Sequence, residues 1–523
     1  MKKHILLLVL LLLNAFVFAA KNYFVSGTGS DSNNGSSPTL AFRNIQKAAN
    51  LVNAGDTVFV MNGTYKSVLM NDVVYIIRKG TASEWIVFIN YPNHKPKIEF
   101  DGWNGFAIQP GAAYIEINGF EVEGNNKNVK LDDALNQSQG CKNPGGEFLP
   151  KYNGNGIASD GRYGTTATKP HHLRILNNQV HDCGGGGISA IHTDYVTIKN
   201  NLVYNNSWYT IFGSSGISLY QLWDSDNNAT DFKNVIEGNI CHHNRLFVPW
   251  VYCPCCFSDG NGIIIDDTNN TQNGSTLGAY KGKTVIQNNI VYQNGGSGIH
   301  SYESQHVTIV NNTAYKNSQT PEIDGGEIFS NSSNDIKIVN NILYAENGNA
   351  VNSNYKNTNF LYENNLHYNG TKTVVTSASC INVNPDFRNE SIFDFHLKGF
   401  SPCINKGNAT TFAARDFDGN KRPLVLGNKP AIGAFEFAEL TPIVDVKNHS
   451  NIKIYPNPTS GILTYESSEV IDKIVCFNIL GVEVKPKIKD KTLDFSENTE
   501  GVYKVVFYLN NKIVGVDSFV KRD

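Results

Sequence analysis

One short stretch of the chain combines carboxylates with an apolar run. In SDGNGIIIDD, Asp259 precedes three isoleucines, and Asp266 and Asp267 follow them. Neighbouring carboxylates either bind a hard cation together, which makes all three candidate Ca²⁺ ligands, or shift each other's pKa values, which suits an acid/base pair. Asp-Gly and Asp-Asp also form ordinary turns, so a buried strand between two turns is the alternative. Polar residues at equivalent positions of neighbouring segments favour a functional site.

Four other segments can be aligned with this stretch on a Gly-apolar pair. The five pairs are Gly156-Ile157, Gly187-Ile188, Gly216-Ile217, Gly262-Ile263 and Gly298-Ile299. Side chains alternate between the two faces of a strand. If the apolar residue points inward, the residue after it points outward.

The alignment defines three rows of side chains that cross neighbouring strands. Outer row 1, directly after the Gly-apolar pair, contains Ala158, Ser189, Ser218, Ile264 and His300. Outer row 2, two residues further on, contains Asp160, Ile191, Tyr220, Asp266 and Tyr302. The corner row, one residue later at a predicted turn, contains His192, Gln221, Asp267 and Glu303. Acids, imidazoles and phenols are therefore expected to converge on one face.

The elements that would position these rows follow from a repeat that ends in an Asn pair. Its six copies are LRILNN, VTIKNN, VIQNN, VTIVNN, IKIVNN and FLYENN, and their second Asn residues are Asn178, Asn201, Asn289, Asn312, Asn341 and Asn365. The clean intervals of 23, 23, 29 and 24 residues are typical of a parallel β-solenoid. Stacked Asn side chains can hydrogen-bond along such a solenoid at the strand spacing of about 4.8 Å. An antiparallel sandwich, the alternative, would show turns every 8 to 12 residues or so and no recurring Asn pair.

The composition fits an elongated β-structure. With 523 residues and 40% hydrophobic content, the chain can bury a continuous core and add a smaller domain. The 46 Gly residues suit tight corners, so we expect little helix. The net charge of −3 provides no broad basic surface for nucleic acid, and neither phosphate-binding glycine motif occurs. We expect a monomer.

Residues 1–20 have the pattern of a secretory signal peptide. Lys2 and Lys3 precede an apolar run from Ile5 to Leu13, and small residues follow at Ala19 and Ala20. The run is too short to span a bilayer, and no later segment is long enough. We therefore expect an exported protein without a transmembrane segment.

The nine Cys residues are an odd number, so at least one is not in an intramolecular disulfide. Cys253, Cys255 and Cys256 crowd into the sequence CPCC. Because the separate Cys-x2-Cys pairs of a zinc site are missing, disulfides or packing are favoured over a metal.

Residues 22–65 carry an amphipathic helix signal from Phe42 to Val52, followed by a Gly-Asp turn and a strand. This segment resembles the opening coil of secreted right-handed parallel β-helix proteins of the pectate-lyase-like superfamily, in which a short helix caps the solenoid. Residues 384–437 look like the closing coils of the same superfamily. The resemblance implies an all-β, right-handed β-helix catalytic domain over residues 21–437, interrupted by an insertion near 125–152.

The sequence changes character after residues 438–450, which form a predicted linker. Residues 451–523 contain IKIYPNPTSG and GVYKVVFYLNNKIVGVDSFVKRD. They resemble the C-terminal sorting domain of the Bacteroidota type IX secretion system, with Tyr455 to Gly461 as the matching motif. The resemblance implies a small β-sandwich, the secretion machinery as partner, and a secreted or cell-surface protein.

Asp259-Gly-Asn-Gly-Ile-Ile-Ile resembles the Asp-Gly-Asn-Gly-apolar-Lys-Leu motif of polysaccharide lyase family 9, whose members are Ca²⁺-dependent pectate lyases. The family's catalytic Lys falls at Ile264, which cannot accept a proton. The preceding coil has no matching cluster of three Asp. Pectate specificity therefore does not carry over, although a Ca²⁺ cofactor stays possible.

We predict an extracellular lyase that cleaves an acidic polysaccharide by β-elimination. This reaction needs neutralisation of the uronate carboxylate, a base at C5 and an acid for the leaving oxygen. Arg245 or Ca²⁺ would neutralise the carboxylate. His192 or His300 would be the base, and Tyr220 or Tyr302 the acid. Further candidate substrate-binding residues are Trp250, Trp223, Gln221 and Asp160.

Two other functions fit the same residues. A glycoside hydrolase on this scaffold would use Asp266, Asp267 and Glu303 as acid and nucleophile or base. A non-catalytic glycan-binding surface protein would use the same face as an aromatic and polar platform. Because β-helices host several chemistries, the fold alone does not decide between them.

Overall fold

The structure is a computed structural model, and it describes residues 20–67, 71–138, 148–253, 255–425, 427–437, 452–468, 470–478, 483–509 and 512–522. The predicted linker and all but the last residue of the predicted signal peptide lie outside these ranges. The chain divides into two compact units, Met1–Phe437 and Ala438–Asp523. No helix in the described ranges is both long and apolar enough to cross a membrane.

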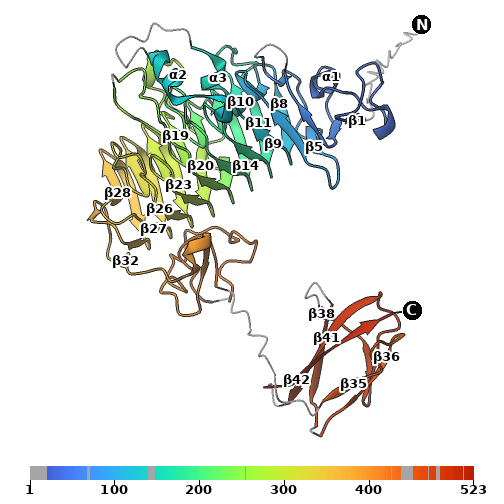
Figure 1. Cartoon of the computed structure of the whole chain (residues 1–523). Helices are drawn as coiled ribbons and strands as arrows, with labels where there is room; N and C mark the ends of the chain where they lie inside the picture. The colour runs from blue at the N-terminus through green and yellow to red at the C-terminus, as the bar shows by residue number, and fades with distance from the viewer. Residues whose placement is uncertain are drawn as a thin grey trace, which may run out of the picture. The chain divides into compact units, whose positions relative to one another are not determined.

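The first unit is a right-handed parallel β-helix, as predicted. In each coil the chain runs through a strand of sheet C, then of sheet A, then of sheet B, so that each sheet pairs strands from successive coils in parallel. Figure 1 shows these strands side by side along the stack.

Sheet A has eleven strands in the described part of the chain. They are β1 (Asn22–Val25), β2 (Thr57–Val60), β5 (Ile86–Asn90), β8 (Ala113–Asn118), β11 (His171–Leu176), β14 (Asp194–Lys199), β17 (Phe232–Glu237), β20 (Lys283–Gln287), β23 (Gln305–Val310), β26 (Asn334–Val339) and β29 (Thr358–Glu363).

Sheet B also has eleven described strands, most of them three residues long. They are β3 (Gly63–Tyr65), β6 (Pro96–Glu99), β9 (Glu121–Glu123), β12 (Gln179–His181), β15 (Leu202–Tyr204), β18 (Ile240–His242), β21 (Ile290–Tyr292), β24 (Thr313–Tyr315), β27 (Ile342–Tyr344), β30 (Leu366–Tyr368) and β32 (Ile381–Asn382).

Sheet C, which carries the predicted rows, has ten described strands. They are β4 (Val74–Ile76), β7 (Asn104–Ile108), β10 (Asn155–Asp160), β13 (Ile188–Ile191), β16 (Ile217–Tyr220), β19 (Ile263–Asp266), β22 (Ile299–Tyr302), β25 (Ile328–Asn331), β28 (Ala350–Tyr355) and β31 (Lys372–Thr373).

Helices are few and short in the described ranges, as predicted. They are η1 (Pro38–Leu40), α1 (Ile45–Ala49), η2 (Asn126–Asn128), α2 (Leu131–Leu135), η3 (Asn136–Ser138), α3 (Pro150–Asn153), η4 (Gln272–Gly274) and η5 (Glu390–Ile392). The predicted capping helix is present as α1, shorter than the sequence signal. Its Ile45, Ala48 and Ala49 join the end of the solenoid core.

A ladder of buried Asn side chains runs along the turn between sheets A and B, and it explains the Asn pairs. The first Asn of a pair takes a left-handed conformation, with φ of 55° at Asn177 and 54° at Asn288, which Asn tolerates well. The second Asn stacks. Nδ2 of Asn289, for example, donates to Oδ1 of Asn312 at 3.0 Å, and Oδ1 of Asn289 accepts from Nδ2 of Asn239 at 2.9 Å.

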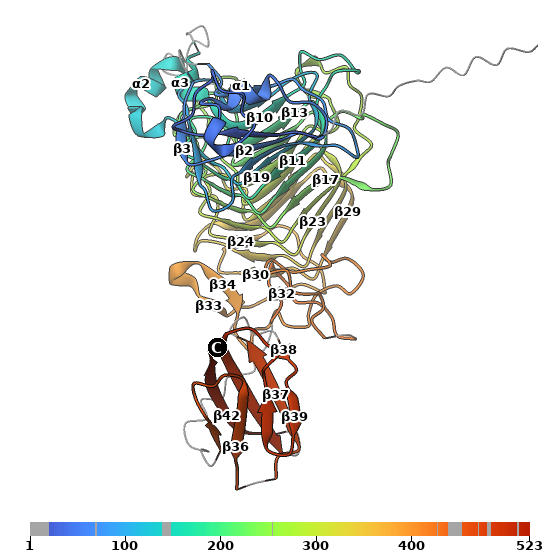
Figure 2. The same cartoon turned by 90° about the vertical axis from the view of Figure 1, so that its right-hand side faces the viewer.

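Three loops at the edge between sheets B and C pack into a small core of their own. The core contains Ala134, Tyr152, Ile211 and Val248, one or two from each loop. The first loop is the predicted insertion, which carries α2 and α3, and Figure 2 shows these helices on one side of the first unit. The insertions therefore stabilise one another beside sheet C.

The end of the first unit folds over the last coils. The hairpin of β33 (Phe387–Asn389) and β34 (Asp394–Leu397) contributes Phe387 and Phe395 to a second apolar cluster that also contains Tyr315, Tyr344 and Phe435. This cluster covers the outer side of sheet B near its end.

The second unit has two four-stranded antiparallel sheets. The first contains β35 (Lys453–Tyr455), β36 (Ile462–Glu466), β40 (Thr492–Asp494) and β39 (Lys487–Lys489), and the second contains β38 (Glu483–Val484), β37 (Lys473–Asn478), β41 (Gly501–Leu509) and β42 (Lys512–Lys521). Leu463 and Leu493 of one sheet and Val505 and Phe507 of the other share one apolar core. The unit is therefore a small β-sandwich.

Candidate active site

The strands of sheet C pair in the register that the Gly-apolar alignment predicts. Ser218, Ile264 and His300 are direct neighbours in outer row 1, and Tyr220, Asp266 and Tyr302 are direct neighbours in outer row 2. The residues between the rows, such as Ile265, are fully buried, whereas Asp266 is partly exposed. Both outer rows therefore face away from the solenoid core.

Asp266 lies between two phenols in outer row 2. Oδ1 of Asp266 accepts a hydrogen bond from Nε2 of Gln272 at 3.1 Å. Burial raises the pKa of Asp266 well above its usual range, and the negative charge of Asp259 raises it further. Burial also raises the pKa of Tyr220 to about 12 and raises the pKa of Tyr302. All three groups therefore tend to keep their protons at neutral pH.

His300 is the imidazole of outer row 1 and lies next to Tyr302. The ring centroids of His300 and Tyr302 are 5.9 Å apart, and the His300 ring stacks on Phe329 at 4.6 Å. Burial lowers the pKa of His300 to about 4, so the ring is neutral at neutral pH. Its buried Nε2 has no hydrogen-bond partner among the described residues, nor has the buried hydroxyl of Ser218. Unpaired buried polar atoms are rare in proteins, which makes these two atoms unusual features of the outer face of sheet C.

Asp267 has a structural environment that differs from that of Asp266. It is fully buried at a left-handed corner. Its oxygens accept hydrogen bonds from Nε2 of Gln221, from the backbone N–H groups of Thr271 and Gln272, all at 2.8 Å, and from the Thr271 hydroxyl at 3.0 Å. Asp267 therefore anchors the turn after β19. Glu303, next to it in the corner row, is partly exposed and accepts from the Thr271 hydroxyl at 3.3 Å.

His192 and Gln221 belong to the same chain of corner contacts. Nε2 of His192 lies 3.2 Å from Oε1 of Gln221, and Nδ1 of His192 lies 3.4 Å from Nζ of Lys169. Nε2 of Gln221 also donates to the carbonyl of Gln272 at 2.8 Å. Both ring nitrogens of His192 thus have protein partners, in contrast to His300.

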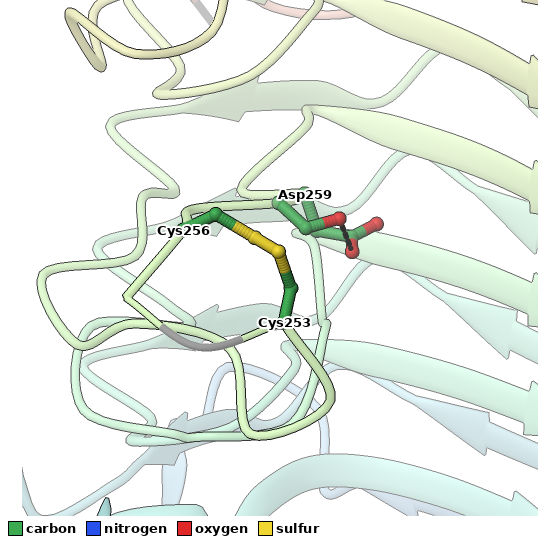
Figure 3. Close-up of a disulfide and its surroundings, with 4 residues drawn as sticks. Cys253, Cys256 and Asp259 are labelled. Atoms are coloured by element: carbon green, nitrogen blue, oxygen red, sulfur yellow. Dashed lines mark hydrogen bonds between the residues drawn. A yellow bond between two sulfur atoms is a disulfide. The ribbon is translucent and has the colours of Figure 1, made fainter. Parts of the chain in front are cut away.

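Asp259 lies in the loop before β19, beside a disulfide. The disulfide joins Cys253 and Cys256, whose Cα atoms are 5.5 Å apart, which agrees with the prediction of disulfides or packing rather than a metal for CPCC. Figure 3 shows the disulfide and Asp259 in this loop. Oδ2 of Asp259 accepts from the Ser258 hydroxyl at 2.8 Å, and burial raises the pKa of Asp259 to about 6.

The three aspartates do not fit a calcium site. The oxygens of Asp267 already accept four hydrogen bonds from protein donors. In the described part of the chain, no three His, Cys, Asp or Glu side chains are grouped so that they could hold a metal ion. Ca²⁺ prefers six to eight oxygen ligands, roughly. The chemistry proposed below therefore uses no step through a metal.

The predicted substrate-binding residues lie at different places. Arg245 is on the edge between sheets B and C, with its guanidinium 5.1 Å from the Phe247 ring centroid, and its Nε is buried without a hydrogen-bond partner among the described residues. Trp250 is partly exposed in the disulfide loop. Trp223 is only 7% exposed, and its indole N–H donates to the carbonyl of Pro170. Trp223 is therefore a packing residue of its loop.

Asp160 is in outer row 2. It contacts Arg162, a residue that the sequence pattern did not single out. Asp160 is in register with Ile191, which is in register with Tyr220. Its carboxylate forms an ion pair with Arg162, with Nη2 of Arg162 2.7 Å from Oδ2 of Asp160. Arg162 follows the strand in a loop, so the period-two pattern could not place it.

Comparisons with known proteins identify relatives of both units. Residues 23–334 match the family described as "Pel9A-like, right handed beta helix region", and residues 453–521 match the "Secretion system C-terminal sorting domain". No curated protein matches the chain.

Several solved structures are similar to the chain at low identity. The pectate lyase Pel9A is 16% identical, with a TM-score of 0.47, over 81% of this chain and 98% of that one. A rhamnogalacturonan lyase is 14% identical, with a TM-score of 0.39, over 70% of this chain and 87% of that one. XylC, in a complex with xylose, is 12% identical, with a TM-score of 0.38, over 80% and 98% of the two chains.

Proposed function

Because the chain belongs to the Pel9A-like right-handed β-helix family and carries a secretion sorting domain, we propose that it is an exported polysaccharide lyase. Its substrate would be a uronate-containing glycan, cleaved by β-elimination on the outer face of sheet C. The observation that carries the proposal is the grouping of His300, Tyr302 and Asp266 on two neighbouring strands.

His300 is the proposed base. Its neutral imidazole has a pKa of about 4 and a buried Nε2 without a described protein partner. The His300 side chain is partly exposed, so its neutral imidazole could take the C5 proton of a uronate residue. The electron pair of the C5–H bond then forms the C4–C5 double bond, and the C4–O bond breaks. His192 is a weaker candidate because both of its ring nitrogens already have protein contacts.

Tyr302 is the proposed acid. Burial raises its pKa, so its phenol is protonated at neutral pH and can donate to the oxygen that leaves C4. Its ring lies beside that of His300, with 5.9 Å between the centroids. Base and acid can therefore act on the same sugar residue. Tyr220, on the other side of Asp266, is the alternative acid.

In the proposed mechanism the carboxyl group of Asp266 is protonated, and it stabilises the uronate carboxylate by donating a hydrogen bond. Elimination is easier when the negative charge that develops next to C5 receives hydrogen bonds. Because burial and the charge of Asp259 raise the pKa of Asp266, its carboxyl group can stay neutral and donate a hydrogen bond. Asp266 would thus do the work of a metal ion, which the residues present are not suited to bind.

Glycoside hydrolysis is a second candidate, favoured by the pair Asp259 and Asp266. Asp259 lies in the loop before β19, the strand that ends at Asp266, and its charge contributes to the raised pKa of Asp266. Glycoside hydrolases use two carboxyl groups whose pKa values differ. Glu303 could serve as a further carboxylate at the corner.

A single assay separates these functions. The full exported protein is incubated with a panel of uronate-containing and neutral polysaccharides, with and without EDTA. Ultraviolet absorbance of unsaturated ends and new reducing ends are measured separately. We expect both signals on a uronate glycan, at equal rates with EDTA. Reducing ends without absorbance would mean hydrolysis, and neither signal on any substrate would mean a glycan-binding protein.

A further inference from the structure

Arg162 presents one free edge of its guanidinium next to the proposed catalytic face. An arginine has two edges that can bind a carboxylate through two parallel hydrogen bonds. Asp160 occupies the edge formed by Nε and Nη2, with Nε 3.0 Å from Oδ1 and Nη2 2.7 Å from Oδ2. Within the described part of the chain, Nη1 makes no hydrogen bond, so the end of the guanidinium is available.

The guanidinium is held in a fixed orientation. Oδ1 of Asp160 also accepts the backbone N–H of Arg162 at 3.0 Å, which closes a tight local turn. Asp160 itself is the last residue of strand β10, which is paired on both sides, with β7 and β13, in a ten-stranded sheet. A side chain that is fixed in this way loses little conformational entropy when it binds a ligand.

The position of Arg162 along the sheet follows from its partner Asp160, which is in outer row 2. Asp160 is in register with Ile191, and Ile191 is in register with Tyr220. The positive charge of Arg162 also opposes the rise that burial causes in the pKa of Tyr220. Tyr220 is in direct register with Asp266. The distance from one strand to the next is about 4.8 Å. Asp160 therefore lies three strands from Asp266 and four from Tyr302, about 14 and 19 Å along the row, so Arg162 is a few sugar residues away from the proposed catalytic residues.

The surroundings suit a sugar ring. The side chain of Arg162 is 51% exposed, and Tyr163 is 85% exposed, with its ring centroid 6.0 Å from the guanidinium carbon. Between Asp160 and Tyr220, outer row 2 presents the partly exposed side chain of Ile191. An aromatic ring, an apolar floor and a cation together match the faces and the carboxylate of an acidic sugar.

We propose that the free edge of Arg162 binds the carboxylate of a second uronate residue of the polysaccharide, a few residues along the polymer from the one that is cleaved. This inference rests on the proposed function, and it makes Arg162 a positioning residue for acidic glycans. Asp160 acts through Arg162 by holding its orientation.

The test compares Arg162→Gln with the control Arg174→Gln. Arg174 is also a surface arginine paired with an acid, Glu116, but it lies on sheet A. The substrate is the uronate polysaccharide on which the wild-type protein forms unsaturated ends. Its carboxyl-reduced form serves as a competitive inhibitor. Loss of the charge-assisted pair should raise KM about 10- to 100-fold, with little change in kcat.

Three further results are expected if Arg162 recognises the carboxylate. The inhibition constant of the carboxyl-reduced polymer stays unchanged in Arg162→Gln. Arg162→Lys, which keeps the charge but not the two-pronged edge, gives an intermediate KM. Arg174→Gln behaves as the wild type.

Two outcomes would overturn the inference while the proposed function stands. One is an unchanged KM in Arg162→Gln. The other is an equal loss of affinity for the acidic and the carboxyl-reduced polymer, which would assign Arg162 to the structure of its loop. If the wild-type protein forms unsaturated ends on no uronate glycan, the proposed function fails first, and the inference fails with it.

Discussion

At the scale of single residues, adjacent carboxylates of this chain have different environments. Asp266 accepts one described hydrogen bond and faces outward, whereas Asp267 is fully buried and accepts four. The sequence DD alone cannot separate the two, because the partners of Asp267 come from a turn and from Gln221 of the preceding coil. Period-two alternation did place Asp266, since strand β19 keeps a regular register.

Alanine substitutions should separate the two aspartates. We expect Asp266→Ala to lower kcat/KM about 100-fold or more, because one donor to a developing negative charge is lost, while the protein stays folded. Asp267→Ala leaves several buried donors unpaired and should lower the free energy of unfolding by about 3 kcal/mol or more. Steady-state kinetics and thermal unfolding measure the two effects. A full loss of activity in a stable Asp267→Ala protein, with Asp266→Ala active, would reverse the assignment.

The pH dependence of kcat/KM should report His300 and Asp266. His300 must be neutral, so activity falls as the pH drops through its pKa of about 4. Asp266 must be protonated, so activity falls as the pH rises through its raised pKa. Asn at position 266 keeps an N–H donor but cannot ionise. Asp266→Asn should therefore lose the alkaline limb and keep the acid limb; an alkaline limb that is unchanged in this variant would contradict the role of Asp266.

At the scale of the elements, the Asn ladder and the sheet register could be predicted, and the loops could not. The repeat identified six Asn residues of the ladder. It did not identify Asn239, because Gly238, with a φ of 66°, replaces the first Asn of that pair. Arg162 was missed because it follows strand β10 in a loop that has no period. Residues on regular strands are therefore predictable from alternation, whereas the contacts of loop residues depend on distant segments.

The ladder should make a large contribution to stability. Nδ2 of Asn289 donates to the carbonyl of Ile236 at 2.9 Å and to Asn312, and its Oδ1 accepts from Asn239. Asn289→Ala leaves these buried groups unpaired and should cost about 2 to 4 kcal/mol. Asn118→Ala, at the partly exposed end of β8, should cost less than about 1 kcal/mol. Thermal unfolding of both variants checks this, and similar losses in both would contradict a special role for the ladder.

At the scale of the whole molecule, the two units serve different purposes. Each has an apolar core of its own. The proposed catalytic residues all belong to the first unit, and the sorting-domain match lies in the second. We therefore expect export of the protein to be separable from its proposed chemistry.

A protein that comprises residues 20–437 should keep the full activity. Because the candidate site takes no residue from the second unit, kcat/KM should equal that of the complete chain. The same truncation should abolish surface localisation in the secreting cell, since the sorting domain is the segment that the secretion machinery would recognise. A truncated protein that is folded but inactive would show that the second unit takes part in catalysis.

The most direct test of a catalytic face on sheet C compares two tyrosines of outer row 2. Tyr355, 56% exposed, lies two strands beyond Tyr302 in the same register. The measurement is the initial rate of unsaturated-end absorbance on a uronate glycan. Tyr302→Phe, which removes the proposed acid, should lower that rate about 100-fold or more, and Tyr355→Phe should leave it unchanged. Wild-type rates in Tyr302→Phe, or equal losses in both variants, would contradict the assignment.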